Sequence, residues 1–358
     1  MLFSLLSPCL SVYFLTRECH LVAMALLPQF QITASMLRDL ERIAATRTQL
    51  AAAALQVTWV PQLQKDSKYR GAHASTAIEG NPLTLEEVRA LDAGALLPSH
   101  TERSRREITN YFAGLRWMER RTGSDAPITH EDLFELHRRL AGDVMDQGEA
   151  GRYRSMQVRV GRHVPPGPEF VSGLMRELLD WWNGPSKEWS PVISSGILHY
   201  QFEDIHPFAD GNGRSGRMLA LWELYRRGFD THHIFSIDEF YWEDRPRYYQ
   251  QLDAVRTSDG GLTSWLEYTT EGLRLTLDRV WIRMQKLASE SNSEKIVLQP
   301  RQEQVLELLR DRGAISPAEL WAALGITRQG AAKIVIPLMK YNLIKRIGSK
   351  QHGKYVLA

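Results

Sequence analysis

The chain has 358 residues, of which 43% are hydrophobic and 24% are charged. This composition is that of a globular protein with two or three folding units, and it excludes a disordered chain and a disulfide-built scaffold. The formal net charge of +2 excludes a protein that binds polyanions over its whole surface, although a single basic segment is compatible with it.

The first 23 residues differ from the chain that follows them. Residues 1–15 are apolar, but they are fewer than the roughly 20 that a membrane-spanning helix needs, and no Lys or Arg precedes the apolar run as in a signal peptide. We interpret residues 1–23 as an additional segment or a misassigned start, with Met24 as the alternative beginning, although residues 23–25 also fit a cleavage site. Both cysteines lie in this segment and form no metal-binding pattern. We therefore expect a cytoplasmic protein without a membrane anchor.

Residues 24–125 are predicted to form a helical N-terminal region, because apolar residues recur there at intervals of three and four. Thr84 and Glu87 match a capping box at the start of a helix that ends near Gly94. The apolar positions of the neighbouring helices are Leu37, Leu40, Ile43, Ala44, Ile108, Tyr111, Phe112, Leu115 and Trp117.

Residues 126–288 continue the helical pattern with one interruption. Ser190 followed by Pro191 predicts the N-cap and first turn of a helix that delivers the chain to His206. Residues 153–164 instead alternate in the manner of strands and are followed by two prolines. The sequence thus predicts a mainly α-helical core with one small β-hairpin.

Residues 206–217 read HPFADGNGRSGR and join two helical patterns. Gly211 and Gly213, on either side of Asn212, permit positive backbone dihedrals, which would turn successive N–H groups inward as an anion-binding nest. A helix predicted to begin at Arg214 would add the positive end of its dipole to the same place. The loop therefore predicts a phosphate site.

Four side chains of this loop add the chemistry of phosphate transfer. Arg214 and Arg217 lie three residues apart on one helical turn, so both guanidinium groups can bind phosphate oxygens. Asp210 offers a hard oxygen ligand for a Mg²⁺ ion that bridges phosphates, and His206 has an unperturbed pKa suited to accepting a hydroxyl proton. Taken alone, Asp-Gly-Asn-Gly would be an ordinary turn, but the combination favours a functional site.

Residues 206–217 match every fixed position of His-x-Phe-x-Asp/Glu-Gly-Asn-Gly-Arg-x-x-Arg, and the chain therefore resembles the Fic family. The resemblance implies an enzyme that uses ATP and Mg²⁺ to transfer AMP to a Tyr, Thr or Ser hydroxyl of a target protein, including this chain itself. It implies His206 as the base, Asp210 as the Mg²⁺ ligand, residues 211–213 as the cradle of the α- and β-phosphates, and the two arginines as phosphate ligands. The stretch 153–164 resembles the family's flap, which aligns an extended target segment by strand addition.

Alternatives to AMP transfer stay open at this point. The same fold could remove AMP or move another phosphate-linked group, or the chain could be a DNA-binding regulator whose core only senses a nucleotide. A homodimer is compatible with each of these interpretations.

Residues 75–80, Ser-Thr-Ala-Ile-Glu-Gly, resemble the inhibitory motif of Fic proteins, Ser/Thr-x-x-x-Glu-Gly/Asn. Ser75 and Glu79 are four residues apart and would share one face of a helix. The resemblance implies that Glu79 pairs with Arg217 and occupies the place of the γ-phosphate, so that ATP binds unproductively. The alternative is a helix that ends at Glu79 with a solvated carboxylate.

Residues 289–299 are polar and predict a linker, which separates the core from a C-terminal domain at residues 300–358. The segment from residue 296 onward holds ten basic and four acidic residues. Its pattern predicts three helices and then two strands, at 343–347 and 355–357, an arrangement that resembles a winged helix.

A winged helix would place particular side chains against DNA. Thr327, Arg328, Gln329 and Lys333 lie where a recognition helix meets the major groove, and Lys350 and Lys354 lie where a wing touches phosphates. Because winged helices also serve as protein-docking modules, the partner of this domain is either DNA or a protein.

Overall fold

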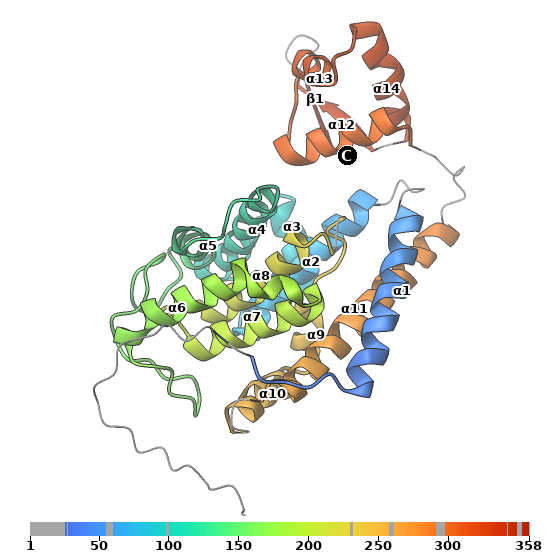
Figure 1. Cartoon of the computed structure of the whole chain (residues 1–358). Helices are drawn as coiled ribbons and strands as arrows, with labels where there is room; N and C mark the ends of the chain where they lie inside the picture. The colour runs from blue at the N-terminus through green and yellow to red at the C-terminus, as the bar shows by residue number, and fades with distance from the viewer. Residues whose placement is uncertain are drawn as a thin grey trace, which may run out of the picture.

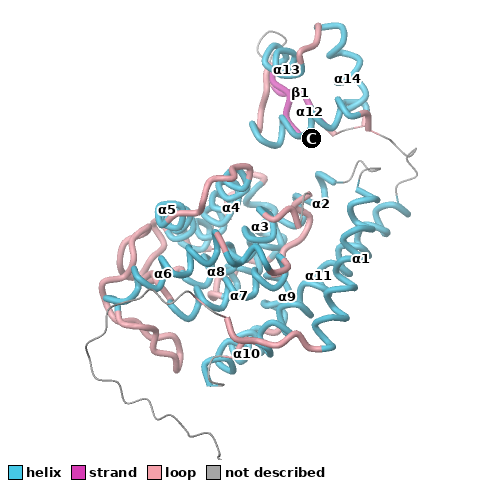
Figure 2. The backbone as a smooth tube through the Cα atoms, in the orientation of Figure 1, coloured by secondary structure: helices cyan, strands magenta, loops and turns pink. Residues whose placement is uncertain are grey.

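The computed structural model of the chain describes residues 26, 28–54, 60–97, 100–229, 232–257, 261–290, 298–341, 343–348 and 353–357. These residues are mainly helical, as predicted, and their two short strands lie near the C-terminus (Figure 2). The elements are α1 (Ala34–Ala54), α2 (Val60–Ile78), α3 (Leu85–Asp92), α4 (Glu102–Thr122), α5 (His130–Ala141), α6 (Pro168–Asn183), η1 (Pro185–Glu188), α7 (Pro191–Ile205), α8 (Asn212–Arg226), α9 (Asp238–Glu243), α10 (Arg245–Thr257), α11 (Thr263–Glu290), α12 (Pro300–Arg312), α13 (Pro317–Leu324), α14 (Arg328–Lys340), β1 (Ile344–Ile347) and β2 (Lys354–Leu357).

Helices α7 and α8 form the centre of the helical core (Figure 1). Nearly every residue of both helices is buried, which explains why their apolar residues occur on all sides and not along one stripe. The two helices pack along each other and meet at residues 206–211, the connection between them. The fold therefore places the conspicuous loop of the sequence at the junction of two core helices, where part of it is buried and His206, Ala209 and Asp210 are partly exposed.

The N-terminal helices belong to the same hydrophobic core. Helix α1 lies beside α11 (Figure 1), and α2 packs against α9 and α4. One continuous cluster of buried apolar residues runs from Met36 to Met284 and includes residues on both sides of the domain boundary expected near residue 125. The helix that carries Ser75 is consequently held against the helices of the central loop.

Two helix starts that the sequence predicts from local capping signals are confirmed. The capping box predicted at Thr84 is confirmed: its N–H donates to the Glu87 carboxylate at 2.9 Å, and the Glu87 N–H donates to the Thr84 hydroxyl at 3.3 Å. The helix ends at Asp92, shortly before Gly94, which has a φ of +86°. The Ser190 cap and Pro191 start of α7 are confirmed as well.

The β-hairpin predicted for residues 153–164 is wrong as a pair of strands. The connection between α5 and α6 is a loop (Figure 2) with one β-bridge, in which Val160 and His163 exchange two N–H···O bonds of 3.0 and 2.9 Å. The main-chain N–H of Arg154 donates to the Pro207 carbonyl at 2.9 Å, so this end of the segment is bonded to the central loop and not to a partner strand.

The C-terminal residues build a second, smaller cluster of buried apolar side chains. Helices α12, α13 and α14 precede the antiparallel strands β1 and β2, in which Ile344 pairs with Leu357 and Ile347 with Lys354. The predicted order of three helices and two strands is confirmed. Helix α11 continues to Glu290, so the linker predicted at residues 289–299 begins two residues too early, and residues 291–297 of it lie outside the described residues.

The N-terminal segment and the membrane are the subject of two further predictions. The segment 1–23, interpreted as an additional or misassigned start, lies outside the described residues. None of the helices that the structure describes is both long and apolar enough to cross a membrane.

Gly196→Ala is expected to lower the melting temperature, because an added Cβ would lie 2.8 Å from Leu266 Cδ2 and 2.9 Å from Thr269 Oγ1 of α11. Such overpacking costs about 1–3 kcal/mol, which exceeds the roughly 1 kcal/mol that a helix gains when Ala replaces Gly. Gly173→Ala in α6 is the matched control and should raise the melting temperature, since a Cβ there meets no atom within 4 Å. Calorimetry measures both, and a stabilised Gly196→Ala would contradict the close packing of α7 against α11.

Candidate active site

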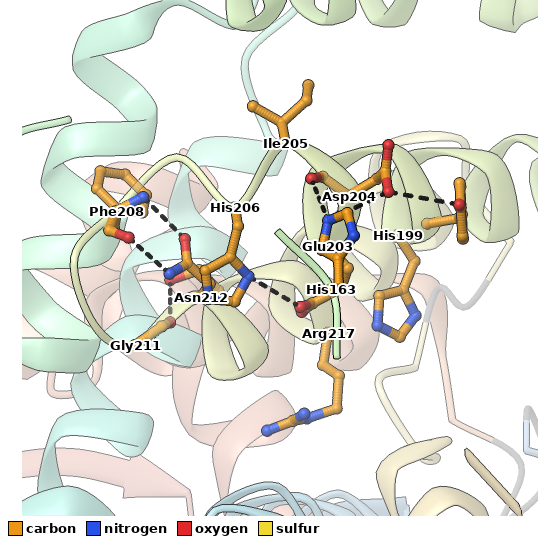
Figure 3. A network of polar contacts seen from close by, with 12 residues as sticks. His163, His199, Glu203, Asp204, Ile205, His206, Phe208, Gly211, Asn212 and Arg217 are labelled. Carbon is orange, nitrogen blue, oxygen red and sulfur yellow. Dashed lines mark hydrogen bonds and ion pairs between the residues drawn. The ribbon is translucent and has the colours of Figure 1, made fainter. Parts of the chain in front are cut away.

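The central loop begins with a histidine in an unusual backbone conformation. Helix α7 ends at Ile205, and His206 adopts the left-handed conformation with φ 49° and ψ 61°. Its N–H still donates to the Phe202 carbonyl at 2.9 Å, which closes the last turn of the helix. A non-glycine residue in this region stores about 1–3 kcal/mol of strain and persists only where the surroundings hold it. The imidazole of His206 is thus placed by a constrained turn (Figure 3).

Asn212 holds the loop together from inside (Figure 3). Its side-chain oxygen accepts the Phe208 N–H at 2.9 Å, and its side-chain nitrogen donates to the Phe208 carbonyl at 2.9 Å. The residue is buried, so these two bonds satisfy polar atoms that would otherwise be costly. The sequence assigned Asn212 to the phosphate cradle; its side chain braces the loop instead, which leaves only its backbone N–H for a phosphate.

His137 also holds the loop, and the sequence did not single it out as a site residue. Its Nδ1 accepts the Gly151 N–H at 2.8 Å, so Nε2 carries the proton and donates to the Asp210 carbonyl at 2.8 Å. Burial lowers the pKa of His137 to about 4, and the ring stacks on Phe208 at a centroid distance of 3.7 Å. A polar residue on the buried face of α5 was the available signal in the sequence.

The amino end of α8 has no side-chain cap. Gly211 is the N-cap with φ +75°, and the first bond of the helix runs from the Ser215 N–H to the Gly211 carbonyl at 3.1 Å. The N–H groups of residues 212–214 therefore precede the first intrahelical bond, and they point along the helix axis where the dipole is positive. Such a helix start is a ready-made anion site.

Gly213 differs from its prediction. A positive φ was predicted for both glycines of the loop and is confirmed for Gly211, but Gly213 has ordinary helical geometry and is not among the residues with positive φ. Its hydrogen is required for another reason: an added Cβ would lie 2.2 Å from Glu79 Oε1 and 3.1 Å from Arg217 Nη1. Glycine at this position thus admits the carboxylate of Glu79, the residue directly after α2, to the first turn of α8.

The predicted contact between Glu79 and Arg217 is confirmed. Arg217 Nη2 donates to Glu79 Oε1 at 2.8 Å and to the Ser75 carbonyl at 2.8 Å, and its Nε donates to the Ser75 hydroxyl at 3.0 Å. The guanidinium is almost fully buried, and Asp238 lies 3.7 Å from its Nε. Burial opposes ionisation of the Glu79 carboxyl, but Arg217 outweighs it and lowers the pKa. The carboxylate is therefore ionised in this state.

Asp210 has room for a metal ion. Its Oδ1 accepts the Gly211 N–H at 2.6 Å and its Oδ2 accepts the Asp146 N–H at 3.1 Å, so each oxygen keeps a further lone pair. Among the described residues no group of three or more His, Cys, Asp and Glu side chains could hold a metal ion. A Mg²⁺ ion at Asp210 would consequently need phosphate oxygens and water as its other ligands, as this ion prefers.

Arg214 completes the predicted set at the start of α8. The residue is buried, and its Nη1 lies 3.5 Å from the Leu140 carbonyl, a weak contact, while its Nε has no hydrogen-bond partner. A buried guanidinium with free donors beside an uncapped helix start favours an anionic ligand. The structure therefore brings together all the loop residues that the sequence singled out.

Glu203 faces the imidazole of His206, and nothing in the sequence indicated this. Its Oε2 lies 3.7 Å from His206 Nδ1 (Figure 3), and Gly216 makes room for it, because a Cβ there would lie 2.6 Å from Glu203 Oε1. Burial raises the pKa of Glu203 to about 7 and lowers that of His206 to about 4. The imidazole is neutral at pH 7, and its Nε2 is the nitrogen left for a substrate.

Comparison with known proteins agrees with this geometry. Residues 127–224 match the family model described as Fic/DOC family. Protein adenylyltransferase fic-1 of Caenorhabditis elegans is 32% identical over 256 residues, which are 70% of this chain and 48% of that protein. Protein adenylyltransferase Fic of Drosophila willistoni is 31% identical over 243 residues, 67% of this chain and 47% of that protein. The chain thus spans about half the length of the curated relatives it matches.

Solved structures share the fold. A Fic family protein from Desulfovibrio desulfuricans G20 superposes with a TM-score of 0.62 at 28% identity, over 93% of this chain and 98% of that chain. A segment of Fic-1 from Caenorhabditis elegans gives a TM-score of 0.61 at 26% identity, over 72% of this chain and 74% of that chain. The family match includes the whole of residues 206–217 but begins after Glu79.

Glu203→Gln is expected to stabilise the fold more as the pH rises from about 4.5 to about 7. Below pH 4.5 the carboxyl is protonated in both the folded and the unfolded chain; above it the unfolded chain ionises first, because burial raises the folded pKa from 4.5 to about 7. The free energy of unfolding of the wild type then falls by up to about 3 kcal/mol, at roughly 1.4 kcal/mol per pKa unit, whereas that of Glu203→Gln does not change for this reason.

Urea unfolding of the wild type and Glu203→Gln at several pH values measures this difference. The gain in the free energy of unfolding should grow across the window and level off above it. A gain that is the same at pH 4.5 and pH 8 would show that the Glu203 carboxyl is not held in its neutral form by the fold.

Proposed function

Because residues 127–224 of this chain form a Fic/DOC family domain, we propose that the protein is a protein adenylyltransferase, which transfers AMP from ATP to a hydroxyl side chain of a target protein. One observation carries the proposal: a neutral, constrained imidazole and an uncapped helix start stand at the two ends of one braced loop. The adenylyltransferases of Caenorhabditis and Drosophila, at about 30% identity, support it.

The chain's own groups account for triphosphate binding. The N–H groups of residues 212–214 and the dipole of α8 attract phosphate oxygens, and Arg214 and Arg217 add two guanidinium groups. Asp210 would hold Mg²⁺, which supplies neutralisation of phosphate charge when it is bound. Because the loop is fixed before any ligand arrives, little reorganisation is needed when charge develops on the phosphate.

The transfer step follows from the position of His206. The target hydroxyl oxygen forms a bond to the α-phosphorus, while the bond from the α-phosphorus to the oxygen that bridges to the β-phosphate breaks. Pyrophosphate leaves, AMP stays on the target, and the hydroxyl proton passes to Nε2 of His206, since Nδ1 faces Glu203. The same fold acting in the opposite sense, to remove AMP, is the runner-up.

We also propose that Glu79 inhibits this reaction within the chain. Its carboxylate occupies a donor of Arg217 and lies against Gly213, at the start of the helix that would receive phosphates. A negative charge there repels the triphosphate and competes for Arg217, so nucleotide binding and the Glu79 contact oppose each other. The resting enzyme is therefore expected to be slow.

Glu79→Gly is expected to raise the transfer of label from α-labelled ATP to the chain itself on the order of 10- to 100-fold, because Arg217 then loses its carboxylate partner and can bind phosphate. His206→Ala in that background should lower transfer by about 10²- to 10⁴-fold, which is the usual contribution of general base catalysis. Glu86→Ala, an exposed carboxylate on α3, is the control and should leave transfer unchanged.

Intact-mass spectrometry of the same samples identifies the reaction. One added AMP supports adenylyl transfer, another mass identifies a different transferred group, and loss of AMP from a modified target supports the reverse reaction. Equal labelling of Glu79→Gly and Glu79→Gly/His206→Ala would refute the proposed role of the imidazole.

The C-terminal residues favour a second activity, and we propose that α12–α14 with β1–β2 form a winged helix that binds duplex DNA. One face of α14 exposes Gln329, Ala332 and Lys333, whose side chains suit base edges in the major groove. The exposed Ile336 and Met339 on the same helix support the runner-up, a protein-docking module.

Anisotropy of a labelled duplex with the full chain tests DNA binding. The affinity should fall as salt rises, with a slope of about 0.9 per phosphate contacted. Lys333→Ala should weaken binding by about 1–3 kcal/mol, whereas Lys187→Ala, an exposed lysine outside these residues, should not change it. No binding at low salt would favour the docking module.

A further inference from the structure

Arg154 is a buried cation between the central loop and the surface segment before α6. Only 4% of the residue is exposed. The hydrogen bonds of its guanidinium end on the main-chain carbonyls of described residues, and none of them ends on a carboxylate. A buried guanidinium is costly unless its donors are satisfied, so the position selects for a group with several donors in one plane. The Asp210 site and the phosphate-binding groups do not involve this side chain.

One side of the guanidinium holds the end of α7. Arg154 Nε donates to the His206 carbonyl at 2.8 Å, and Nη2 donates to the Ile205 carbonyl at 3.4 Å. The main-chain N–H of the same residue donates to the Pro207 carbonyl at 2.9 Å. Three successive carbonyls around the left-handed turn are therefore bonded to one residue, at the negative end of the helix dipole.

The other side of the guanidinium holds the segment that carries the β-bridge. Nη1 donates to the Met156 carbonyl at 3.1 Å, and Nη2 donates to the Pro166 carbonyl. Between these two points lies the bridge of Val160 with His163. His163 Nε2 also lies 3.0 Å from the Asp204 carbonyl (Figure 3), so the middle of the segment touches the same turn of α7.

We propose that Arg154 is a positioning residue of the transfer reaction, which holds His206 in its left-handed conformation and couples that conformation to segment 155–166. The expected effect of Arg154 on the reaction rate rests on the proposed function. Because the same guanidinium bonds both sides, a displacement of the segment changes the carbonyls that fix the imidazole. A target segment that aligns along residues 155–166 therefore meets an imidazole that Arg154 already holds in place, and a target that displaced these residues would displace the imidazole as well.

Arg154→Lys in the Glu79→Gly background is expected to lower kcat on the order of 100-fold and to leave KM for ATP within about a factor of two, because a misplaced base affects the transition state and not the phosphate contacts. Lysine keeps the charge, but a single ammonium cannot reach carbonyls on both sides. Arg154→Ala should lose activity equally and regain part of it in millimolar guanidinium chloride, but not in ammonium chloride.

Arg121→Ala is the matched control. Arg121 also bonds several main-chain carbonyls at a chain turn, those of Ser124, Ala126 and Pro127, together with the Asp132 carboxylate. Its removal should lower the melting temperature without changing kcat or producing a response to guanidinium. A loss of kcat that matches the loss of stability in both variants would overturn the proposal, as would an unchanged kcat in Arg154→Lys.

Hydrogen exchange separates this claim from the proposed function. In Arg154→Ala the amides of residues 156–163 and of residues 205–212 are expected to lose protection together, and in Arg121→Ala neither group should change. If Glu79→Gly transfers no AMP, the proposed function is refuted. The coupling between Arg154 and the two segments is then tested by hydrogen exchange alone. Protection lost in only one of the two segments overturns the coupling.

Discussion

The uncapped amino end of α8 is the feature around which the rest of the structure is arranged. A helix start inside a hydrophobic core leaves N–H groups without partners, and it gathers positive charge when Arg214 and Arg217 follow within one turn. In the state described here, Glu79 offsets that charge through Arg217. A triphosphate would offset it as well, and under the proposed function this competition would let one site serve for both nucleotide binding and inhibition.

The loop before α8 is fixed by side chains that come from other elements. His137 bonds the Asp210 carbonyl, Asn212 bonds both main-chain atoms of Phe208, and Arg154 bonds the carbonyls around His206. These buried polar groups satisfy one another, so their desolvation is offset and the backbone is held in one conformation. A loop held in this way presents its N–H groups and imidazole without rearrangement, which is what electrostatic catalysis requires.

The sequence predicted the features of the fold and the site that depend on residues close together in the chain. Capping boxes, the glycine with positive φ and the arginine spacing on one turn leave local patterns, and the pairing of Glu79 with Arg217 followed from a motif. Residues 153–164 were misread because alternation alone does not say whether the partner of the Arg154 N–H is a strand or, as found, the Pro207 carbonyl. Glu203 and His137 were missed because their partners are defined only by packing, and Gly213 serves a contact 134 positions away in sequence, with Glu79.

Under the proposed function, a triphosphate replaces the Glu79 carboxylate at the start of α8. A crystal structure of Glu79→Gly with a non-hydrolysable ATP analogue and Mg²⁺ tests it most directly. We expect phosphate oxygens on the N–H groups of residues 212–214 and on Arg217, with the α-phosphorus on the Nε2 side of His206. A nucleotide bound elsewhere, or an imidazole turned away from the α-phosphorus, would contradict it.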